Sequence, residues 1–297
     1  MSQISRRHFN ALFGAGVASI AVPAGIRAQS KPKVVVIGGG AAGATTARYL
    51  AKDAGGEIDV TLISALDTYT TCFFSNLYLG DLRTYASITH SYKTIADEYG
   101  VNVVIGYAAG IDRAKKSVEM ADGSAVEYDR LVVAPGIDIK YDSVSGYSEQ
   151  AAQVAPHAWQ AGVQTTLLKT KLDALENGQN IVLVPPPNPY RCPPGPYERV
   201  SMMAHILKTR GLTDSRIIII DPKEKFSKQG LFQEGWDNHY PDMIEWYGSD
   251  VHGGIAGVDV DAGTVETDLD TFEGALLNII PGQKAGSIAD NGGLTND

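Results

Sequence analysis

The sequence of 297 residues predicts an α/β fold with two domains, each built on a parallel β-sheet. Two apolar stretches, Lys33–Ile37 and Ile181–Val184, each lead into a turn that is followed by a helical stretch. A further apolar strand comes after each helix, at residues 59–63 and 216–221. Strands that alternate with helices in this way are typical of parallel sheets, and the length suits two ordinary domains.

The turn after the first strand matches the pattern G-x-G-x-x-G and precedes a helix predicted at residues 44–53. Its residues are Gly38, Gly39, Gly40, Ala41, Ala42 and Gly43. In this context Gly38 permits the tight turn, Gly40 lets the backbone approach a pyrophosphate, and Gly43 lets the helix pack closely on the strand. The helix N-terminus stabilises the pyrophosphate charge. The first unit is therefore predicted to bind a dinucleotide, as a Rossmann-like domain does.

The residue after the second strand departs from this pattern. An acidic side chain normally binds the ribose hydroxyls there, whereas this chain has Ser64. A hydroxyl can pair with ribose, although more weakly than a carboxylate, and Asp67 can reach the same place from the next turn. The sequence leaves the ribose contact open between these two residues.

The rest of the first domain follows in order. Its predicted elements are a helix at 89–98, a strand at 101–105, a hairpin of 117–120 and 125–128 around Asp122-Gly123, and a strand at 130–136 that ends in the turn Ala134-Pro135-Gly136. An Asp-Gly pair between alternating strands is a strong hairpin signal. A parallel sheet with such a hairpin has the form of an FAD-binding domain of the glutathione-reductase type, which we predict at residues 31–144.

The second domain is predicted at residues 145–274 and has the element order of an NAD-binding unit. Its predicted elements are a helix at 161–175, the strand at 181–184, a helix at 197–209 with Pro196 at its start, and the strand at 216–221. Residues 275–297 are predicted to return to the first domain. The chain ends before the elements that normally complete a protein of this design, so we expect a fragment.

The turn between the strand at 181–184 and the following helix has an unusual composition. It contains several prolines, Cys192 and, six residues further on, Glu198, where a nucleotide-binding unit has a glycine-rich phosphate loop. A backbone without these glycines gives a pyrophosphate no close approach. The sequence therefore predicts that NAD(P)H is not a partner and that sulfur chemistry takes place here instead.

The first 28 residues are predicted to be a targeting segment. Ser5-Arg6-Arg7-His8-Phe9 is a twin-arginine pattern, a weakly apolar run spans Ala11–Ile26, and Ala28 is the expected last residue before cleavage. The run is short for a membrane span of about 20 residues, and an uncleaved anchor is the alternative. The twin-arginine route exports folded, cofactor-loaded proteins, so a periplasmic location is predicted.

The composition limits the classes of partner. The formal net charge is −9, and removal of the three arginines in residues 1–28 brings it to −12. An acidic protein is poorly suited to bind nucleic acid or anionic lipid, so neither is predicted. The six histidines lack the spacing of metal ligands, so no metal site is predicted.

Cys72 and Cys192 are the two cysteines of the chain. In an oxidising compartment they can form a structural disulfide with each other. Cys72 can also be a small buried apolar side chain. Both alternatives compete with a role of these thiols in redox chemistry.

Several stretches are similar to one group of flavoproteins. They are Val34–Gly43, Thr70–Cys72 with Ser75-Asn76, Val133–Gly136, Gly146–Glu149, Pro156–Trp159, Arg191–Glu198 and Gly293–Asp297. Together they resemble the flavoprotein subunit of flavocytochrome c sulfide dehydrogenase, which is close kin to the sulfide:quinone oxidoreductases. The resemblance spans residues 31–297 and is most specific in the motif Arg191–Glu198.

The resemblance implies a role for each cysteine. Cys72 would be bonded covalently to FAD, which Asn76 and the turn Ala134–Gly136 would also contact. Cys192 would be one half of a redox-active disulfide beside the flavin, and the other cysteine would lie beyond Asp297. Sulfide would break that disulfide to give a persulfide and a thiolate, and two electrons would pass to the flavin.

Two further expectations concern the helix that follows Cys192. A helix N-terminus lowers a thiol pKa, so the position of Cys192 just ahead of a helix is expected to favour its thiolate as a leaving group. The resemblance implies that Glu198, in the first turn, handles a proton beside the disulfide. The alternative for Glu198 is a favourable interaction with the helix dipole.

The implied function is that of a periplasmic, FAD-dependent sulfide dehydrogenase subunit that oxidises sulfide to a polysulfide or sulfur-level product. Electrons would pass to a c-type cytochrome subunit in a heterodimer, because this chain has no C-x-x-C-H motif. One alternative is a membrane-associated sulfide:quinone oxidoreductase. Another is a non-catalytic flavoprotein partner of a sulfur-oxidation system. Without the second redox cysteine, the chain alone is expected to be inactive.

Overall fold

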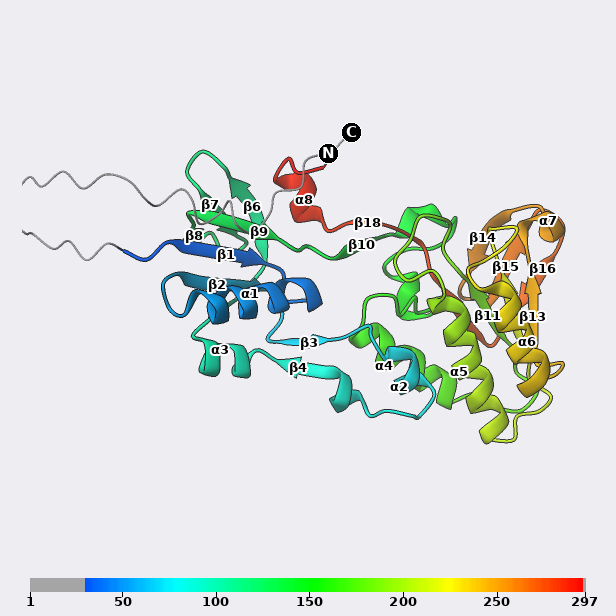
Figure 1. The fold of residues 1–297 in the computed structure, drawn as a ribbon. Helices are drawn as coiled ribbons and strands as arrows, with labels where there is room; N and C mark the ends of the chain where they lie inside the picture. Colours follow the sequence, from blue (N-terminus) through cyan, green and yellow to red (C-terminus); the bar gives the residue numbers. More distant parts are fainter. Residues whose placement is uncertain (1–29, 296–297) are drawn as a thin grey trace, which may run out of the picture. The chain divides into compact units, whose positions relative to one another are not determined.

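The computed structural model describes residues 30–295, so the predicted signal peptide at residues 1–28 lies outside the described residues. The described chain is an α/β fold with two parallel sheets, as the sequence predicts (Figure 1). Among residues 30–295, no helix is both long enough and apolar enough to cross a membrane.

The first parallel sheet has the strand order β5-β2-β1-β9. Its strands are β1 (Lys33–Ile37), β2 (Asp59–Ser64), β5 (Asn102–Ile105) and β9 (Arg130–Val133). The elements on its faces are α1 (Ala41–Ala54), α3 (Lys93–Tyr99), β6 (Ala108–Asp112), β7 (Ser117–Met120), β8 (Ala125–Glu127) and α8 (Ser287–Asn291). Because side chains alternate along a strand, Val36 and Leu62 pack with α1 and α3, while Val35 and Ile63 pack with the antiparallel strands.

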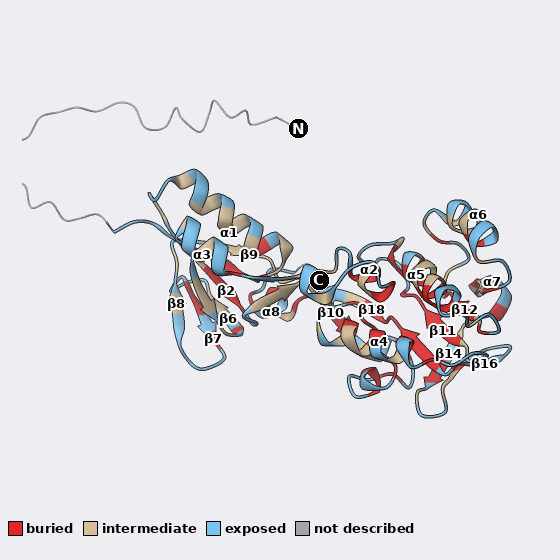
Figure 2. Ribbon diagram, turned by 90° about the horizontal axis from the view of Figure 1, so that it is seen from below, coloured by how far each residue is buried: buried red, intermediate tan, exposed pale blue. Residues whose placement is uncertain are grey.

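The second parallel sheet has the order β13-β12-β11-β17. Its strands are β11 (Ile181–Val184), β12 (Ile217–Ile220), β13 (Ile244–Tyr247) and β17 (Leu276–Ile279). Around it lie α4 (Val163–Asp173), α5 (Gly195–Thr209), α6 (Gln229–His239), α7 (Ser249–His252), β14 (Ile255–Asp259), β15 (Thr264–Thr267) and β16 (Thr271–Glu273). Ile181 and Leu183 face the helices and Val182 and Val184 face β14–β16, so β11 is buried on both sides (Figure 2).

Two antiparallel pairs run between these sheets (Figure 1). They are β3 (Thr68–Thr70) with β4 (Thr89–Ser91), and β10 (Ile137–Lys140) with β18 (Gly282–Ala285). From β3 the chain enters α2 (Ser75–Leu79), which packs on α4 and α5. Leu79 is fully buried in the core of the second domain. The segment that carries Cys72 and Asn76 thus belongs to the first domain in sequence but lies against the second.

The predicted strands and hairpin are confirmed, whereas several predicted boundaries differ from the structure, two of them for a reason that lies in strand pairing. The helix expected at 89–98 begins only at Lys93, because the backbone of Thr89–Ser91 pairs with β3 to form β4. The return expected at residue 275 is placed too early, because residues 276–279 form β17 and pair with β11 in the second sheet. The chain leaves that sheet only with β18, which pairs with β10.

Candidate functional site

The glycine turn after β1 is tightly packed at two of its three pattern positions. Gly38 has a φ of +106°, and a Cβ there would overlap the carbonyl oxygen of Ala134. A Cβ on Gly43 would overlap the carbonyl oxygen of Gly38, so glycine lets α1 pack on β1. At Gly40 the nearest side chain, Tyr69, would lie 3.8 Å from a Cβ, which leaves this side of the turn open.

Helix α1 begins directly beside this opening. Its N-cap residue is Gly40, which has no side chain to cap the first turn. The backbone N–H groups of Ala41, Ala42 and Gly43 therefore remain available to an anion, and the helix dipole favours negative charge at this end. The arrangement fits the pyrophosphate of a dinucleotide.

A cavity of about 130 Å³ lies at the carboxyl end of the first sheet. Its lining includes Gly38, Ala65, Pro135 and Gly286. The turn Ala134–Gly136 is fixed beside β1, because the Ala134 N–H donates to the Ile37 carbonyl at 2.8 Å. The predicted cofactor residues of the glycine turn and of the turn after β9 are thus brought together at one edge of the sheet.

The structure gives Ser64 a different role from the expected ribose contact. The residue is buried, its hydroxyl donates to the Leu66 carbonyl at 2.7 Å, and it lies 3.0 Å from the Tyr92 hydroxyl. Tyr92 in turn donates to the Gly39 carbonyl at 2.9 Å. The Ser64 hydroxyl therefore fixes the turn that follows β2, while the Asp67 side chain is exposed.

Cys72 lies in a hydrogen-bonded turn between β3 and α2. Its carbonyl oxygen accepts from the Ser75 hydroxyl at 2.8 Å and from the Ser75 backbone N–H at 3.2 Å. The Thr71 hydroxyl accepts from the Phe73 N–H at 3.1 Å. Cys72 is half-buried, and the structure has no disulfide between it and Cys192.

Asn76 connects this turn to the start of α5 in the second domain. Its amide Nδ2 donates to a Glu198 carboxylate oxygen at 2.6 Å and to the Gly195 carbonyl at 3.2 Å. Glu198 is in the first turn of α5, and Cys192 lies three residues before Gly195, whose N–H donates to the Cys192 carbonyl at 2.8 Å. The structure therefore brings Asn76, Glu198 and Cys192 together from segments far apart in the sequence.

The surroundings of Cys192 contradict the expected effect of the helix on its acidity. Cys192 is an exposed residue, but the pKa of its thiol is raised, first by partial desolvation and then by Glu198 and Cys72, while Arg191 opposes the shift. The residue also has a φ of +58°, which is uncommon for any residue other than glycine. Burial and the adjacent carboxylate outweigh the helix N-terminus in this structure.

Arg199 is a buried residue of α5 that no sequence pattern singles out. Its guanidinium donates to Asn76 Oδ1 at 3.2 Å, to Asn278 Oδ1 at 3.1 Å, and to the carbonyls of His157 at 2.8 Å and Ala158 at 2.6 Å. All four acceptors are neutral, and burial lowers the pKa of Arg199 to about 9. Arg199 therefore holds α2, α5, β17 and the segment at 157–158 together behind Asn76.

His157 supports the same region from within the core. It is almost completely buried, and its Nδ1 accepts from the Trp159 N–H at 3.0 Å. Burial, aided by the positive charge of Arg199, lowers the pKa of His157 to about 4, so the ring is neutral at neutral pH. Within residues 30–295, no group of three His, Cys, Asp or Glu side chains is placed to hold a metal ion.

Comparison with known proteins supports this reading of the fold. A model of the pyridine nucleotide-disulphide oxidoreductase family matches residues 32–182, just over half of the chain. The model described as the central part of the flavocytochrome c sulfide dehydrogenase flavoprotein chain matches residues 165–281, which include Cys192 and Glu198.

The chain is also similar to individual proteins. It is 28% identical over 182 residues to a sulfide-quinone reductase of Aquifex aeolicus, covering 60% of this chain and 40% of that protein. It is 29% identical over 128 residues to a type II NADH:quinone oxidoreductase of Staphylococcus saprophyticus, covering 43% of this chain and 32% of that protein. The chain thus spans less than half the length of these two relatives.

A solved structure of the sulfide:quinone oxidoreductase from Aquifex aeolicus has the same fold. The TM-score is 0.71 at 18% identity, and the superposition covers 88% of this chain and 61% of that one. The family match over residues 32–182 agrees with the two parallel sheets and the glycine turn. The chain belongs to the pyridine nucleotide-disulphide oxidoreductase family.

Proposed function

We propose that this chain is the flavoprotein subunit of a sulfide dehydrogenase, with Cys192 as the thiol that reacts with sulfur. The observation that carries the proposal is the junction of the two domains, where Asn76 bonds to Glu198 beside the loop at residues 185–194, which contains Cys192. The match of residues 165–281 to the sulfide dehydrogenase flavoprotein model includes this loop and adds support.

The residues of the first domain fit a bound FAD. The turn Gly38–Gly43 and the start of α1 would hold its pyrophosphate, the turn Ala134–Gly136 would flank it, and Asn76 would lie near the flavin ring. We propose a thioether from Cys72 to the flavin, because this thiol is free, half-buried and held in a fixed turn. When bound, the flavin supplies an acceptor for two electrons that can release them singly.

The second domain supplies the sulfur chemistry. Hydrosulfide would attack one sulfur of a disulfide between Cys192 and the second cysteine that the resemblance implies. A new S–S bond forms as the disulfide bond breaks, and the departing thiolate keeps the electron pair that is passed on. Glu198 is placed to take the proton of the hydrosulfide, because its carboxylate is held close to Cys192 by Asn76.

The acceptor in this proposal is a c-type cytochrome subunit in the periplasm, reached by twin-arginine export. NAD(P)H is not a partner in this account. Two features support its exclusion: residues 185–194 contain no glycine, and the acidic residue after β12, Asp221, is completely buried. A phosphate loop needs glycines and a ribose contact needs an accessible carboxylate, and this part of the chain has neither.

A sulfide:quinone oxidoreductase is the second candidate, favoured by the 28% identity to a sulfide-quinone reductase over 182 residues. A non-catalytic flavoprotein partner of a sulfur-oxidation system is the third. The experiment that separates them measures sulfide-dependent reduction of c-type cytochrome and of a soluble quinone by the full-length protein with flavin bound. We expect reduction of cytochrome c; reduction of quinone alone favours the second candidate, and no turnover with the flavin intact favours the third.

A further inference from the structure

Asp221 is the first residue after β12, at the carboxyl end of the second sheet. In a βαβ nucleotide-binding unit, an acidic residue at this position binds the ribose hydroxyls. Asp221 therefore stands where a related domain would bind a nucleotide, next to the Cys192 loop, which we define as residues 185–194. Unlike a ribose-binding carboxylate, it is completely buried.

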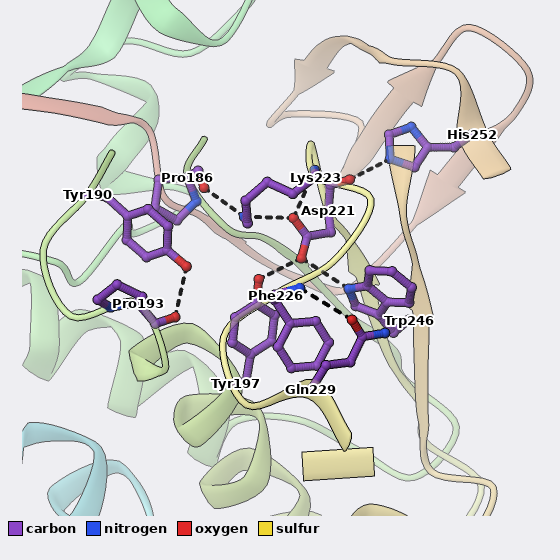
Figure 3. Close-up of polar contacts among 10 residues, drawn as sticks. All are labelled: Pro186, Tyr190, Pro193, Tyr197, Asp221, Lys223, Phe226, Gln229, Trp246 and His252. Atoms are coloured by element: carbon purple, nitrogen blue, oxygen red, sulfur yellow. Dashed lines mark hydrogen bonds and ion pairs between the residues drawn. The ribbon is translucent and has the colours of Figure 1, made fainter. Parts of the chain in front are cut away.

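The carboxylate of Asp221 is fully used by contacts within the protein (Figure 3). Its Oδ2 accepts from the Tyr197 hydroxyl at 2.6 Å and from the Trp246 indole N–H at 3.0 Å. Its Oδ1 accepts from the Lys223 ammonium at 2.7 Å and from the Lys223 backbone N–H at 3.1 Å. A carboxylate offers about four acceptor positions, so Asp221 has none left for a sugar hydroxyl.

Lys223 connects this carboxylate to the first part of the Cys192 loop. Its ammonium also donates to the Pro186 carbonyl at 2.8 Å and lies 5.2 Å from the centre of the Tyr190 ring (Figure 3). The Lys223 side chain is only 10% exposed. A buried ion pair contributes little net stability by itself. The hydrogen bond from Lys223 to the Pro186 carbonyl in the loop is therefore the contact that needs an explanation.

Tyr190 fixes the last part of the same loop. Its hydroxyl donates to the Pro193 carbonyl at 2.8 Å. Cys192 lies between Pro186 and Pro193, the two residues whose carbonyls are held, and has the left-handed backbone conformation. Such a conformation in a residue other than glycine persists only where the surrounding structure imposes it.

We propose that Lys223 and Tyr190, with Asp221 behind them, form a clamp that holds the Cys192 loop in the place where a related domain would bind a nucleotide. The members of the clamp are positioning residues, because they contact the loop and act on the thiol only through it. The proposal rests on the proposed function, because it takes Cys192 as the reacting thiol. The contacts of the clamp do not depend on that function.

Release of the clamp has a predictable effect on the thiol. The charged groups that face Cys192 are Glu198, Arg191 and Arg199, and Cys72 carries no charge once it is bonded to the flavin. Partial burial and Glu198 raise the pKa of Cys192. Cys192 is already an exposed residue. A loosened loop would therefore act mainly by moving the thiol away from Glu198, so its pKa would fall and its thiolate would become more abundant at neutral pH.

The test measures the rate of Cys192 alkylation by iodoacetamide against pH, in the reduced, flavin-loaded, full-length protein, with peptide mass spectrometry to locate the label. Tyr190→Phe removes one neutral hydrogen bond to the loop. We expect alkylation near pH 7 to rise about fivefold, which corresponds to the loss of about one ordinary hydrogen bond. Tyr247→Phe is the matched control, because the Tyr247 hydroxyl bonds to Glu245 on the edge strand of the same sheet.

A second variant tests the ion pair without leaving a buried charge alone. The double variant Asp221→Asn with Lys223→Met removes both charges together and should raise the alkylation rate as Tyr190→Phe does. The single variant Lys223→Arg keeps a cation and should have the alkylation profile of the unaltered protein. An unchanged alkylation profile in a folded Tyr190→Phe protein would overturn the proposal, even if its stability drops. Since no readout uses sulfide, a confirmed clamp in a protein that fails to oxidise sulfide would count against the proposed function alone.

Discussion

Cys72 is the residue whose proposed role is simplest to examine. Its turn is held by Ser75 and Thr71, so the thiol has a fixed position on the segment that joins the two domains. We predict that the flavin stays on the chain after acid denaturation of the full-length protein. Cys72→Ala should release it, because no other thiol lies in this turn. Intact mass and absorbance of the denatured protein measure the outcome.

Cys192→Ala is the control for that prediction. It removes the other thiol of the described chain, and the flavin should remain attached in this variant. A flavin that is released by acid from the unaltered protein would contradict the thioether. A flavin that remains on the Cys72→Ala chain would place the bond elsewhere.

His157 predicts how stability depends on pH. Burial lowers its folded-state pKa from 6.5 to about 4, so between these values the unfolded chain takes up a proton that the folded protein excludes. The free energy of unfolding is therefore unaffected by this group above pH 6.5 and falls as the pH drops towards 4, by about 3 kcal/mol in all. Urea unfolding of the full-length protein at a series of pH values measures the slope.

Two variants isolate the contribution of this histidine. His157→Asn offers an oxygen in place of Nδ1 as acceptor for the Trp159 N–H and should give a flatter profile. His90→Asn changes an exposed histidine and should keep the full slope. Equal slopes in the two variants would show that His157 is not the group responsible.

At the scale of single elements, the first turn of α5 combines two opposing influences on Cys192. The helix end favours a thiolate, whereas burial and the Glu198 charge raise the thiol pKa. Glu198→Gln keeps an acceptor for Asn76 and removes the charge, so we predict that the pKa of Cys192 falls. The pH dependence of its alkylation rate reports this change directly.

Glu198→Asp retains the charge and should leave the profile of Cys192 closer to normal. If Glu198 acts only on the helix dipole, Glu198→Gln would instead cost about 0.3–1 kcal/mol of stability. It would then leave the thiol titration where it was. The two readings of this residue are thus separated by one pair of measurements.

The elements themselves could largely be predicted from the sequence. The strands at 33–37 and 181–184 and the hairpin around Asp122-Gly123 depend on local periodicity and turn residues, which a sequence displays. The strand at 89–91 could not be predicted in this way, because it exists only through pairing with β3. Likewise, residues 276–279 become part of the second sheet because β11 offers them an edge.

At the scale of the whole molecule, the site depends on contacts that no local pattern contains. The bond between Asn76 and Glu198 joins residues 122 positions apart. The motif resemblance could identify both residues, but it could not predict the hydrogen bond between them. Arg199 and Tyr92 are buried and hydrogen-bond to residues of the proposed site. Neither could be identified from the sequence, because a single arginine or tyrosine in a helix or at its start is common.

The two domains divide the chemistry in this account. The first domain presents a dinucleotide turn, open at Gly40, and the second has a proline-rich loop and a buried Asp221 where a nucleotide would bind. Electrons should therefore enter through Cys192 and leave through the flavin, with no entry from a nicotinamide. This separation is the central claim for the molecule as a whole.

Anaerobic reduction of the bound flavin tests that claim most directly. The full-length protein would be mixed with sulfide or with NADH, and the flavin absorbance followed in a stopped-flow instrument for the unaltered protein and for Cys192→Ser. We predict that sulfide bleaches the flavin of the unaltered protein, that Cys192→Ser abolishes this reaction, and that NADH has no effect on either. Rapid bleaching by NADH, or bleaching by sulfide that survives Cys192→Ser, would contradict the account.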